Sequence, residues 1–345
     1  MKKRILLLAM LVVVIFAFSG CGNKGVVLNV YNWGDYIDET VLDDFEEEYG
    51  IKVNYEMFAT NEDMYTKIKQ GGTQYDVIFP SDYMIEKMKN EDLLEMIDMS
   101  KITNYGNIGD QFKGLDYDAD NQYSVPYFWG TVGILYNKTM VDEPVDSWDI
   151  LWDNKYKDQI LMYDSQRDTL AVALKKLGYS LNTRDLNELE EAKQLLIDQK
   201  PLVYAYVGDN VKDMMIGEEA ALAIVWSGEA TATIWENENL EYAIPKEGSN
   251  LWFDAMAIPK GSEHIEEAQL FIDFMTRPDI AFRNADYVGY STPNLEALKQ
   301  IDEETKAMLS VNPDLSKLSN MEVFHDPADF IEEYNRVWTE FKAHE

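Results

Sequence analysis

The sequence predicts an α/β protein built from two similar units. Near the start of the chain, apolar segments with strand patterns alternate with amphipathic helices in the order βαβαβ. A similar alternation returns after residue 160, and no Gly/Ser-rich linker separates the two parts. The 345 residues are 46% hydrophobic and 12% aromatic, which is ample for a packed core.

The first unit is predicted from strand patterns and helix-end residues. Gly50 and the pair Gly71-Gly72 are typical residues after a helix C-terminus, and Asn61 and Ser81 are expected N-caps. The order is typical of a parallel, doubly wound sheet. The predicted elements are, in chain order, a strand at 26–31, a helix at 38–49, a strand at 51–57, a helix at 61–70 and a strand at 77–80.

The second unit repeats this alternation. Gly178 is expected to end one of its helices, and Pro278 to close another. The predicted strands are 160–163, 202–206, 222–226 and 253–259, and the predicted helices are 168–177, 265–276 and a C-terminal stretch at 330–341.

Two units without a flexible linker indicate two lobes joined by short crossing strands. The best crossing candidates are the extended apolar segments 130–136 and 254–258, which are also the expected hinges. We expect discontinuous lobes, with the first formed by 26–132 and 258–300 and the second by 133–257 and 301–345.

The charge balance excludes some classes of partner. The chain carries 30 Lys and Arg against 63 Asp and Glu, a formal net charge of -33. Nucleic acids and anionic lipid surfaces are bound through clustered basic side chains, so neither is expected as a partner. An acidic surface favours cationic partners by long-range attraction.

The N-terminus has the pattern of an export signal. Three basic residues at 2–4 precede an apolar run at 5–18, which has the length of a signal-peptide core and is short for a membrane span. The following residues, Phe18-Ser19-Gly20-Cys21-Gly22, resemble the bacterial lipobox, in which the cysteine is lipidated. We therefore expect a lipoprotein signal peptide at 1–20 and a mature chain tethered to a membrane through Cys21. It would face outward, on a Gram-positive cell surface or in a periplasm.

The sequence shows no motif for catalysis, cofactor binding or metal binding. The three histidines, His264, His325 and His344, are isolated in polar segments, and Cys21 is the single cysteine. Neither metal-ligand spacing nor a Cys/His nucleophile pattern is present, and no nucleophile elbow or phosphate loop occurs. We expect no enzyme activity, no cofactor and no metal.

Aromatic and acidic residues recur together at the carboxyl ends of the predicted strands, where open α/β sheets bind ligands. Ammonium groups need carboxylates or aromatic faces when they lose water, and a methylene chain needs flat apolar walls. A slot of this composition suits a linear polyamine. The groups lie at 31–36, 80–83, 164–168, 226–229, 252–254 and 289–294.

These residues carry a family resemblance over nearly all of the mature chain. The chain resembles the substrate-binding proteins of bacterial spermidine/putrescine ABC transporters. The resemblance implies a two-lobed type II periplasmic-binding-protein-like fold with the ligand clamped in the inter-lobe cleft. It also implies capture of putrescine or spermidine, delivery to an ABC permease and no chemistry on the ligand. The stretches that carry it are Tyr31-Asn32-Trp33, Ser81-Asp82-Tyr83, Leu177-Gly178-Tyr179-Ser180, residues 252–259 and Gly289-Tyr290-Ser291-Thr292-Pro293-Asn294.

The resemblance also implies roles for single residues. Asp254 matches the central anchor, which pairs with an ammonium between Trp252 and Trp226. Asp168 and Ser81 match further polar contacts to the amines. The positions that match the aromatic wall are Trp33, Tyr36, Tyr83, Trp226, Trp252 and Tyr290.

Some positions depart from the spermidine-type pattern. Ser165 stands where that type has an acidic residue, and Asp168 stands where a Glu is usual. Asp35 and Glu229 match acidic positions of the putrescine-type relatives, and Phe324 replaces a Gln near the expected ligand tail. The slot is mixed, so putrescine and spermidine are both retained as ligands.

Three alternative functions stay open at this point. The same lobes can bind another solute, such as a sugar, an amino acid or ferric iron, although an iron site favours histidine ligands that are scarce here. A sensor or adhesion protein would bind a solute without transporting it. A hydrolase would use a pair of carboxylates.

Overall fold

The computed structural model describes residues 25–71 and 74–344. The predicted signal peptide and Cys21 lie outside the described residues. In the described part of the chain, nine strands form one continuous sheet in the order β2-β1-β3-β9-β4-β7-β5-β6, with β8 pairing to β4. The strands are β1 (Val27–Trp33), β2 (Lys52–Phe58), β3 (Val77–Ile78), β4 (Ser124–Asn137), β5 (Ile160–Tyr163), β6 (Val203–Val207), β7 (Leu222–Trp226), β8 (Leu240–Ala243) and β9 (Leu251–Ala257).

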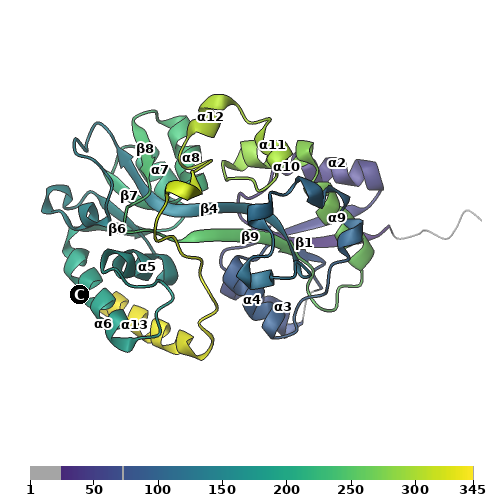
Figure 1. Cartoon of the computed structure of the whole chain (residues 1–345), viewed down its shortest axis with the longest axis horizontal. Helices are drawn as coiled ribbons and strands as arrows, with labels where there is room; N and C mark the ends of the chain where they lie inside the picture. The colour runs from purple at the N-terminus through teal and green to yellow at the C-terminus, as the bar shows by residue number, and fades with distance from the viewer. Residues whose placement is uncertain (1–24, 72–73, 345) are drawn as a thin grey trace, which may run out of the picture.

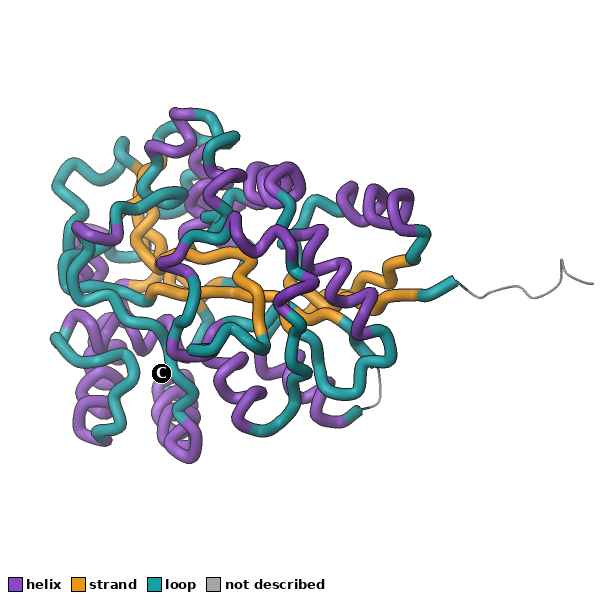
Figure 2. Tube along the Cα trace, turned by 45° about the vertical axis from the view of Figure 1, so that its right-hand side comes forward, coloured by secondary structure: helices purple, strands orange, loops and turns teal. Residues whose placement is uncertain are grey.

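Helices cover both faces of this sheet (Figures 1 and 2). Figure 1 shows α2, α9 and α10 above the right-hand strands and α3 and α4 below them. No helix in the described ranges is long and apolar enough to cross a membrane. The helices are α2 (Thr40–Tyr49), α3 (Asn61–Gln70), α4 (Asp82–Asn90), α5 (Gln166–Lys176), α6 (Leu186–Gln199), α7 (Val211–Ile216), α8 (Ser227–Glu236), α9 (Ile265–Met275), α10 (Pro278–Val288), α11 (Leu295–Leu298), α12 (Glu303–Ala307) and α13 (Ile331–Ala343).

The long strand β4 divides the sheet into two half-sheets. From Ser124 to Thr131 it pairs with β9, and from Val132 onward it pairs with β7 and β8. The first half-sheet contains β1, β2, β3, β9 and the start of β4, and the second contains the rest of β4 with β5 to β8. The predicted crossing at 130–136 coincides with this change of partners. In Figure 1, β4 and β9 run across the middle of the molecule.

The second crossing lies earlier in the chain than predicted. Residues 254–257 are inside β9, which pairs with β3 and with the first part of β4. The chain therefore passes between the half-sheets after β8 and before Leu251, and the expectation of a crossing at 254–258 is wrong. The strand pattern alone could not reveal this, because pairing partners are set by distant segments. The division into lobes stays a prediction, and the pairing of β9 favours placing 251–257 in the first lobe.

Two helix ends also differ from expectation. Thr60, not Asn61, is the N-cap of α3, and its side chain accepts a hydrogen bond from the Asp63 amide at 3.1 Å. Asn61 is the first helical residue, and its side chain is free to point to the site described below. Pro278 begins α10 instead of closing α9, because proline is well accommodated in the first turn of a helix.

Aromatic packing fixes α2 on the first half-sheet. Phe45 of α2 is fully buried, and its ring lies 5.1 Å from Phe271 and 5.4 Å from Phe274 of α9. Burying each such ring stabilises the fold by about 2–3 kcal/mol. The aromatic contacts thus join α2 to α9 beside the first half-sheet.

Candidate functional site

Asp254, the predicted central anchor, lies in a buried cluster on β9. Residues 252 and 254 face the same side of the strand, because side chains alternate along it. Asp254 is 5% exposed, and the Tyr36 hydroxyl donates a 2.6 Å hydrogen bond to its Oδ2. Ser81, the residue before α4, forms a β-bridge with Asp254. Oδ1 of Asp254 is buried and has no hydrogen-bond partner among the described residues.

Burial changes the ionisation of Asp254. Loss of water around the carboxyl raises its pKa from 3.8 to about 6, while hydrogen bonding from Ser81 and Tyr36 lowers it. The carboxyl is therefore mainly ionised at pH 7, as an anion with one oxygen left without a donor. Such an anion is costly to bury unless a cation or a donor reaches it.

Aromatic rings surround this carboxylate. The Tyr290 ring lies 5.2 Å from Trp252 and 5.3 Å from Tyr36, in edge-to-face geometry. Trp33 lies 6.5 Å from Tyr36, and its Nε1 donates to the Phe79 carbonyl at 2.8 Å. Four of the predicted wall residues are thus in contact: Trp33, Tyr36, Trp252 and Tyr290.

Two glycines allow the half-sheets to meet at these rings. A Cβ at Gly228, in the first turn of α8, would overlap the Tyr290 ring. A Cβ at Gly130 would overlap both the Trp252 ring and the Ser227 hydroxyl. Glycine is required at both positions because backbone and ring approach closely. Tyr290 therefore packs directly against the start of α8, and Trp252 packs against β4 at Gly130.

Glu229 forms the centre of a second buried cluster. It lies in the first turn of α8, is 7% exposed and accepts a hydrogen bond from the Tyr163 hydroxyl. The Tyr163 hydroxyl also accepts from the Trp226 amide at 3.0 Å, and the two rings stack at 4.3 Å. Burial raises the pKa of Glu229 from 4.5 to about 8, and Asp209 and Asp168 add to the rise. Tyr163 and Lys212 act in the opposite direction.

Asp168 is a third buried carboxyl, in the first turn of α5. It is 7% exposed and accepts a 2.6 Å hydrogen bond from the Ser165 hydroxyl. Burial raises its pKa, although Ser165, Arg167 and Trp226 lower it. The ends of β5 and β7 thus bring together four predicted site residues: Ser165, Asp168, Trp226 and Glu229.

Tyr83 lies at the border of this arrangement. Its hydroxyl donates to Glu62 at 3.0 Å and accepts from Asn61 at 3.1 Å. Its ring lies 6.5 Å from Phe324, which is 5% exposed. The guanidinium of Arg167 covers the Phe324 ring at 4.3 Å. Phe324, which the sequence predicts near the ligand tail, is therefore packed under the guanidinium of Arg167.

Asp35 lies apart from the buried carboxyls. Its side chain is 90% exposed, and its Oδ2 is 3.9 Å from Nζ of Lys212 on α7. Its role in ligand binding stays a prediction, as do the roles of the other predicted site residues.

Three further residues shape the site and were not predicted as site residues from the sequence. Tyr163 ends β5 as Trp226 ends β7, so the strand-end rule that selected Trp226 would also have selected Tyr163. Asn61 holds Ser81 through two hydrogen bonds, at 3.0 Å to its hydroxyl and 3.2 Å from its amide. Asp82, 1% exposed, accepts from the Phe253 amide at 2.9 Å and so fixes β9 beside α4. Both polar contacts join distant segments, so local sequence carries no signal for them.

The arrangement is suited to holding a cation. Among the described residues, Asp168, Glu229 and Asp254 form no ion pair with Lys, Arg or His, although all three are buried. No group of His, Cys, Asp and Glu in that part of the chain is arranged to hold a metal ion. Buried carboxyls bordered by Trp and Tyr rings can accept ammonium groups and pack against an apolar chain between them.

Comparison with known proteins places the chain in a family. Residues 40–309 match the family described as bacterial extracellular solute-binding protein. The spermidine/putrescine-binding periplasmic protein of Salmonella typhimurium is 38% identical over 319 residues, covering 92% of this chain and 91% of that protein. The putrescine-binding periplasmic protein SpuD of Pseudomonas aeruginosa is 33% identical, with 92% of each chain covered.

Solved structures agree with this placement. The spermidine/putrescine ABC transporter substrate-binding protein PotD of Streptococcus pneumoniae is 47% identical with a TM-score of 0.83, covering 93% of this chain and 99% of that one. The TpPotD lipoprotein of Treponema pallidum is 29% identical with a TM-score of 0.83, covering 91% and 99%. The predicted two-lobed type II periplasmic-binding-protein fold is confirmed.

Proposed function

We propose that this protein, which belongs to the family of bacterial extracellular solute-binding proteins, captures linear polyamines outside the cytoplasm and delivers them to an ABC permease. Putrescine and spermidine are the proposed ligands, because the named relatives above bind them. The observation that carries the proposal is the set of buried carboxyls without ion pairs, Asp168, Glu229 and Asp254, beside contacting aromatic rings.

The chemistry of a polyamine matches this set. Each ammonium gains charge-assisted hydrogen bonds from a buried carboxylate, which are about twice as strong as neutral ones. The methylene segments between the ammonium groups gain apolar contact with Trp226, Trp252 and Tyr290. A neutral sugar would also stack on these rings, but would leave the carboxyls without countercharge.

Each predicted residue has a proposed role. Asp254 holds one ammonium, with Tyr36 and Ser81 fixing its carboxylate, and Glu229 and Asp168 hold the opposite end of the ligand. Ser165 orients Asp168. Trp33 and Tyr83 extend the wall, and Asp35 adds negative charge at the exposed border. We propose no chemical step, because the family and the relatives are transport substrate-binding proteins.

The proposed location is outward-facing, with a lipid tether at Cys21. The pattern around Cys21 supports this, and a related chain from Treponema pallidum is named a lipoprotein. Closure of the lobes on the ligand is proposed to bend the two crossing segments, near Thr131 in β4 and at 244–250 before β9.

Thermal melting of the mature domain tests the function. Putrescine, spermidine, spermine and cadaverine are compared with a neutral sugar. A ligand at 100-fold above its Kd stabilises the folded state by about 2.7 kcal/mol, which shifts the melting temperature clearly. We expect a shift with putrescine or spermidine that is lost in Asp254→Asn. A melting-temperature shift with the sugar alone would contradict the proposal. The absence of a shift with every polyamine would also contradict it.

A further inference from the structure

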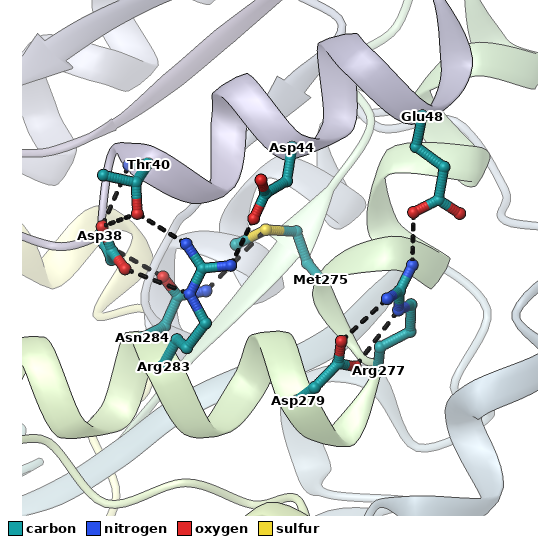
Figure 3. Close-up of polar contacts among 9 residues, drawn as sticks. All are labelled: Asp38, Thr40, Asp44, Glu48, Met275, Arg277, Asp279, Arg283 and Asn284. Carbon is teal, nitrogen blue, oxygen red and sulfur yellow. Dashed lines mark hydrogen bonds and ion pairs between the residues drawn. The ribbon is translucent and has the colours of Figure 1, made fainter.

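The two tyrosines at Asp254 come from segments that flank one helix pair. Tyr36 precedes α2, and Tyr290 follows α10, after a left-handed Gly289 with φ of 85°. The two helices lie side by side, joined by polar contacts along their length (Figure 3). The relative position of α2 and α10 therefore affects the contact between the Tyr36 and Tyr290 rings.

One cluster of contacts lies at the start of α2, close to Tyr36. The Asp38 amide donates to Oδ1 of the fully buried Asn284 at 3.0 Å. Arg283 reaches the same place from α10. Its Nε is 3.4 Å from the Asp38 carboxylate, one terminal nitrogen donates to the Thr40 hydroxyl at 2.6 Å, and the other pairs with Asp44 (Figure 3).

These contacts limit the freedom of the segment that carries Tyr36. The Asp38 carboxylate accepts from the Thr40 amide and hydroxyl, so it joins Arg283 to the first turn of α2. On the other side of Ile37, the Tyr36 carbonyl accepts from the Tyr127 hydroxyl at 2.8 Å. The backbone at 36–38 is thus held at both ends, and the Tyr36 hydroxyl is directed to Asp254.

The same helix pair provides a matched reference at its far end. Arg277, at the start of α10, donates to Glu48 at 2.8 Å and to Asp279 at 2.8 Å (Figure 3). Its side chain is 30% exposed, against 33% for Arg283. Both arginines join α10 to acidic residues of α2, but Arg277 lies at the end of α2 that is distant from Tyr36.

We propose that Arg283 is a positioning residue for ligand binding, which acts through Asp38 and the 36–38 backbone to hold the Tyr36 hydroxyl at Asp254. The inference rests on the proposed polyamine function. Arg283 itself does not touch Asp254 or the aromatic rings, so its effect on affinity is indirect. Partly exposed ion pairs contribute little to stability, so we expect both arginine variants to fold.

Calorimetric titration with putrescine compares Arg283→Gln with Arg277→Gln. We expect Arg283→Gln to raise Kd about tenfold and Arg277→Gln to raise it by about twofold or less. Without ligand, both variants should melt within a few degrees of each other. Arg283→Lys keeps a charge near Asp38 and Asp44 but lacks the fork that also reaches Thr40, so its Kd should lie between those of the wild type and Arg283→Gln.

A double-mutant cycle separates positioning from a general loss of rigidity. Tyr36→Phe removes the hydroxyl through which Arg283 is proposed to act, so adding Arg283→Gln to it should change Kd by less than about twofold. If the tenfold effect of Arg283→Gln persists in the Tyr36→Phe protein, or if the two arginine variants bind equally well, the inference is overturned. Failure of the wild type to bind any polyamine would instead overturn the proposed function.

Discussion

Asp254 and Glu229 are two ends of one proposed slot, and they are built from the same parts. Each is a buried carboxyl that accepts a hydrogen bond from a buried tyrosine and lies beside a tryptophan. Their pKa values nevertheless differ, about 6 for Asp254 and about 8 for Glu229. Burial is the largest cause of both rises. Hydrogen bonds from Ser81 and Tyr36 oppose it at Asp254, and Tyr163 and Lys212 oppose it at Glu229, where the charges of Asp209 and Asp168 add to the rise.

From this difference we propose distinct tasks for Asp254 and Glu229. At pH 7, Asp254 is mainly ionised and can attract an ammonium directly. Glu229, with a pKa of about 8, is mainly protonated, and in the proposed slot it would ionise when an ammonium replaces its proton. Similar residues therefore give a fixed anion at one end and an exchangeable proton at the other.

The substitution Asp254→Asn tests the proposed role of the ionised Asp254 carboxylate. It has the largest expected effect on Kd. Loss of one partner from a buried charge pair costs about 2–5 kcal/mol, so Kd for putrescine should rise at least about 30-fold. The variant should melt no lower than the wild type without ligand, because it removes a carboxyl that is costly to bury. Titration calorimetry measures Kd, and an unchanged value would contradict the assignment.

Glu229→Gln tests the exchangeable proton. Wild-type binding should release nearly one proton at pH 7, because a group with a pKa of about 8 is then mostly protonated. Titrations in phosphate and Tris buffers, which differ in ionisation enthalpy, report this release. In Glu229→Gln the buffer difference should shrink strongly and Kd should rise about tenfold, less than for Asp254→Asn. Equal enthalpies in both buffers for the wild type would contradict the comparison.

The pH dependence of stability tests both carboxyls together. Their folded pKa values, about 6 and about 8, lie above the ordinary values of 3.8 and 4.5. Over this interval the folded state binds more protons than the unfolded state, so stability falls as pH rises. This contribution is fully present below the ordinary values and is lost as pH passes through about 6 and then about 8.

A saturating polyamine should remove this loss, because it supplies the countercharge. The ligand-induced shift in melting temperature is therefore expected to be larger at pH 8 than at pH 5.5. The matched control is the double variant Asp254→Asn, Glu229→Gln, in which the ligand-free stability should depend less on pH. A wild-type shift that shrinks as pH rises would show that the carboxyls are not the ammonium partners.

Asp35→Asn has the smallest expected effect. The side chain is 90% exposed and lies 3.9 Å from Lys212, so water and a resident cation already screen its charge. Kd should change by less than about twofold in a titration at 0.15 M salt. A loss as large as that for Glu229→Gln would place Asp35 among the direct ligands and extend the slot to the surface.

The sequence allowed prediction of the features that depend on local pattern. The strand-end pattern placed Trp226 correctly, because this residue ends β7. For Trp252 and Asp254 the expectation of a carboxyl-terminal strand end is wrong, because both lie inside β9, near its start. Contacts between distant segments could not be predicted from the sequence. Thr60 and Asn61 are equally good caps by residue type, and only tertiary contact with Ser81 decides that Asn61 turns to the site.

The partners of the carboxyls required the structure for the same reason. Tyr163 reaches Glu229 only because β5 and β7 are adjacent in the sheet, and the crossing before β9 follows from its pairing with β3 and β4. The pKa difference between Asp254 and Glu229 also depends on burial and on neighbours from other elements, which residue types alone do not specify.

Titration calorimetry with putrescine and with 1,4-butanediol tests the central claim most directly. The diol has the same four-carbon chain but carries hydroxyls in place of ammonium groups, so it retains the apolar contact and lacks the charge. If buried carboxyls recognise the ligand, putrescine should bind with a Kd below about 100 μM and the diol should show no measurable binding. Equal affinities for putrescine and the diol, or binding of neither ligand, would contradict recognition by buried carboxyls.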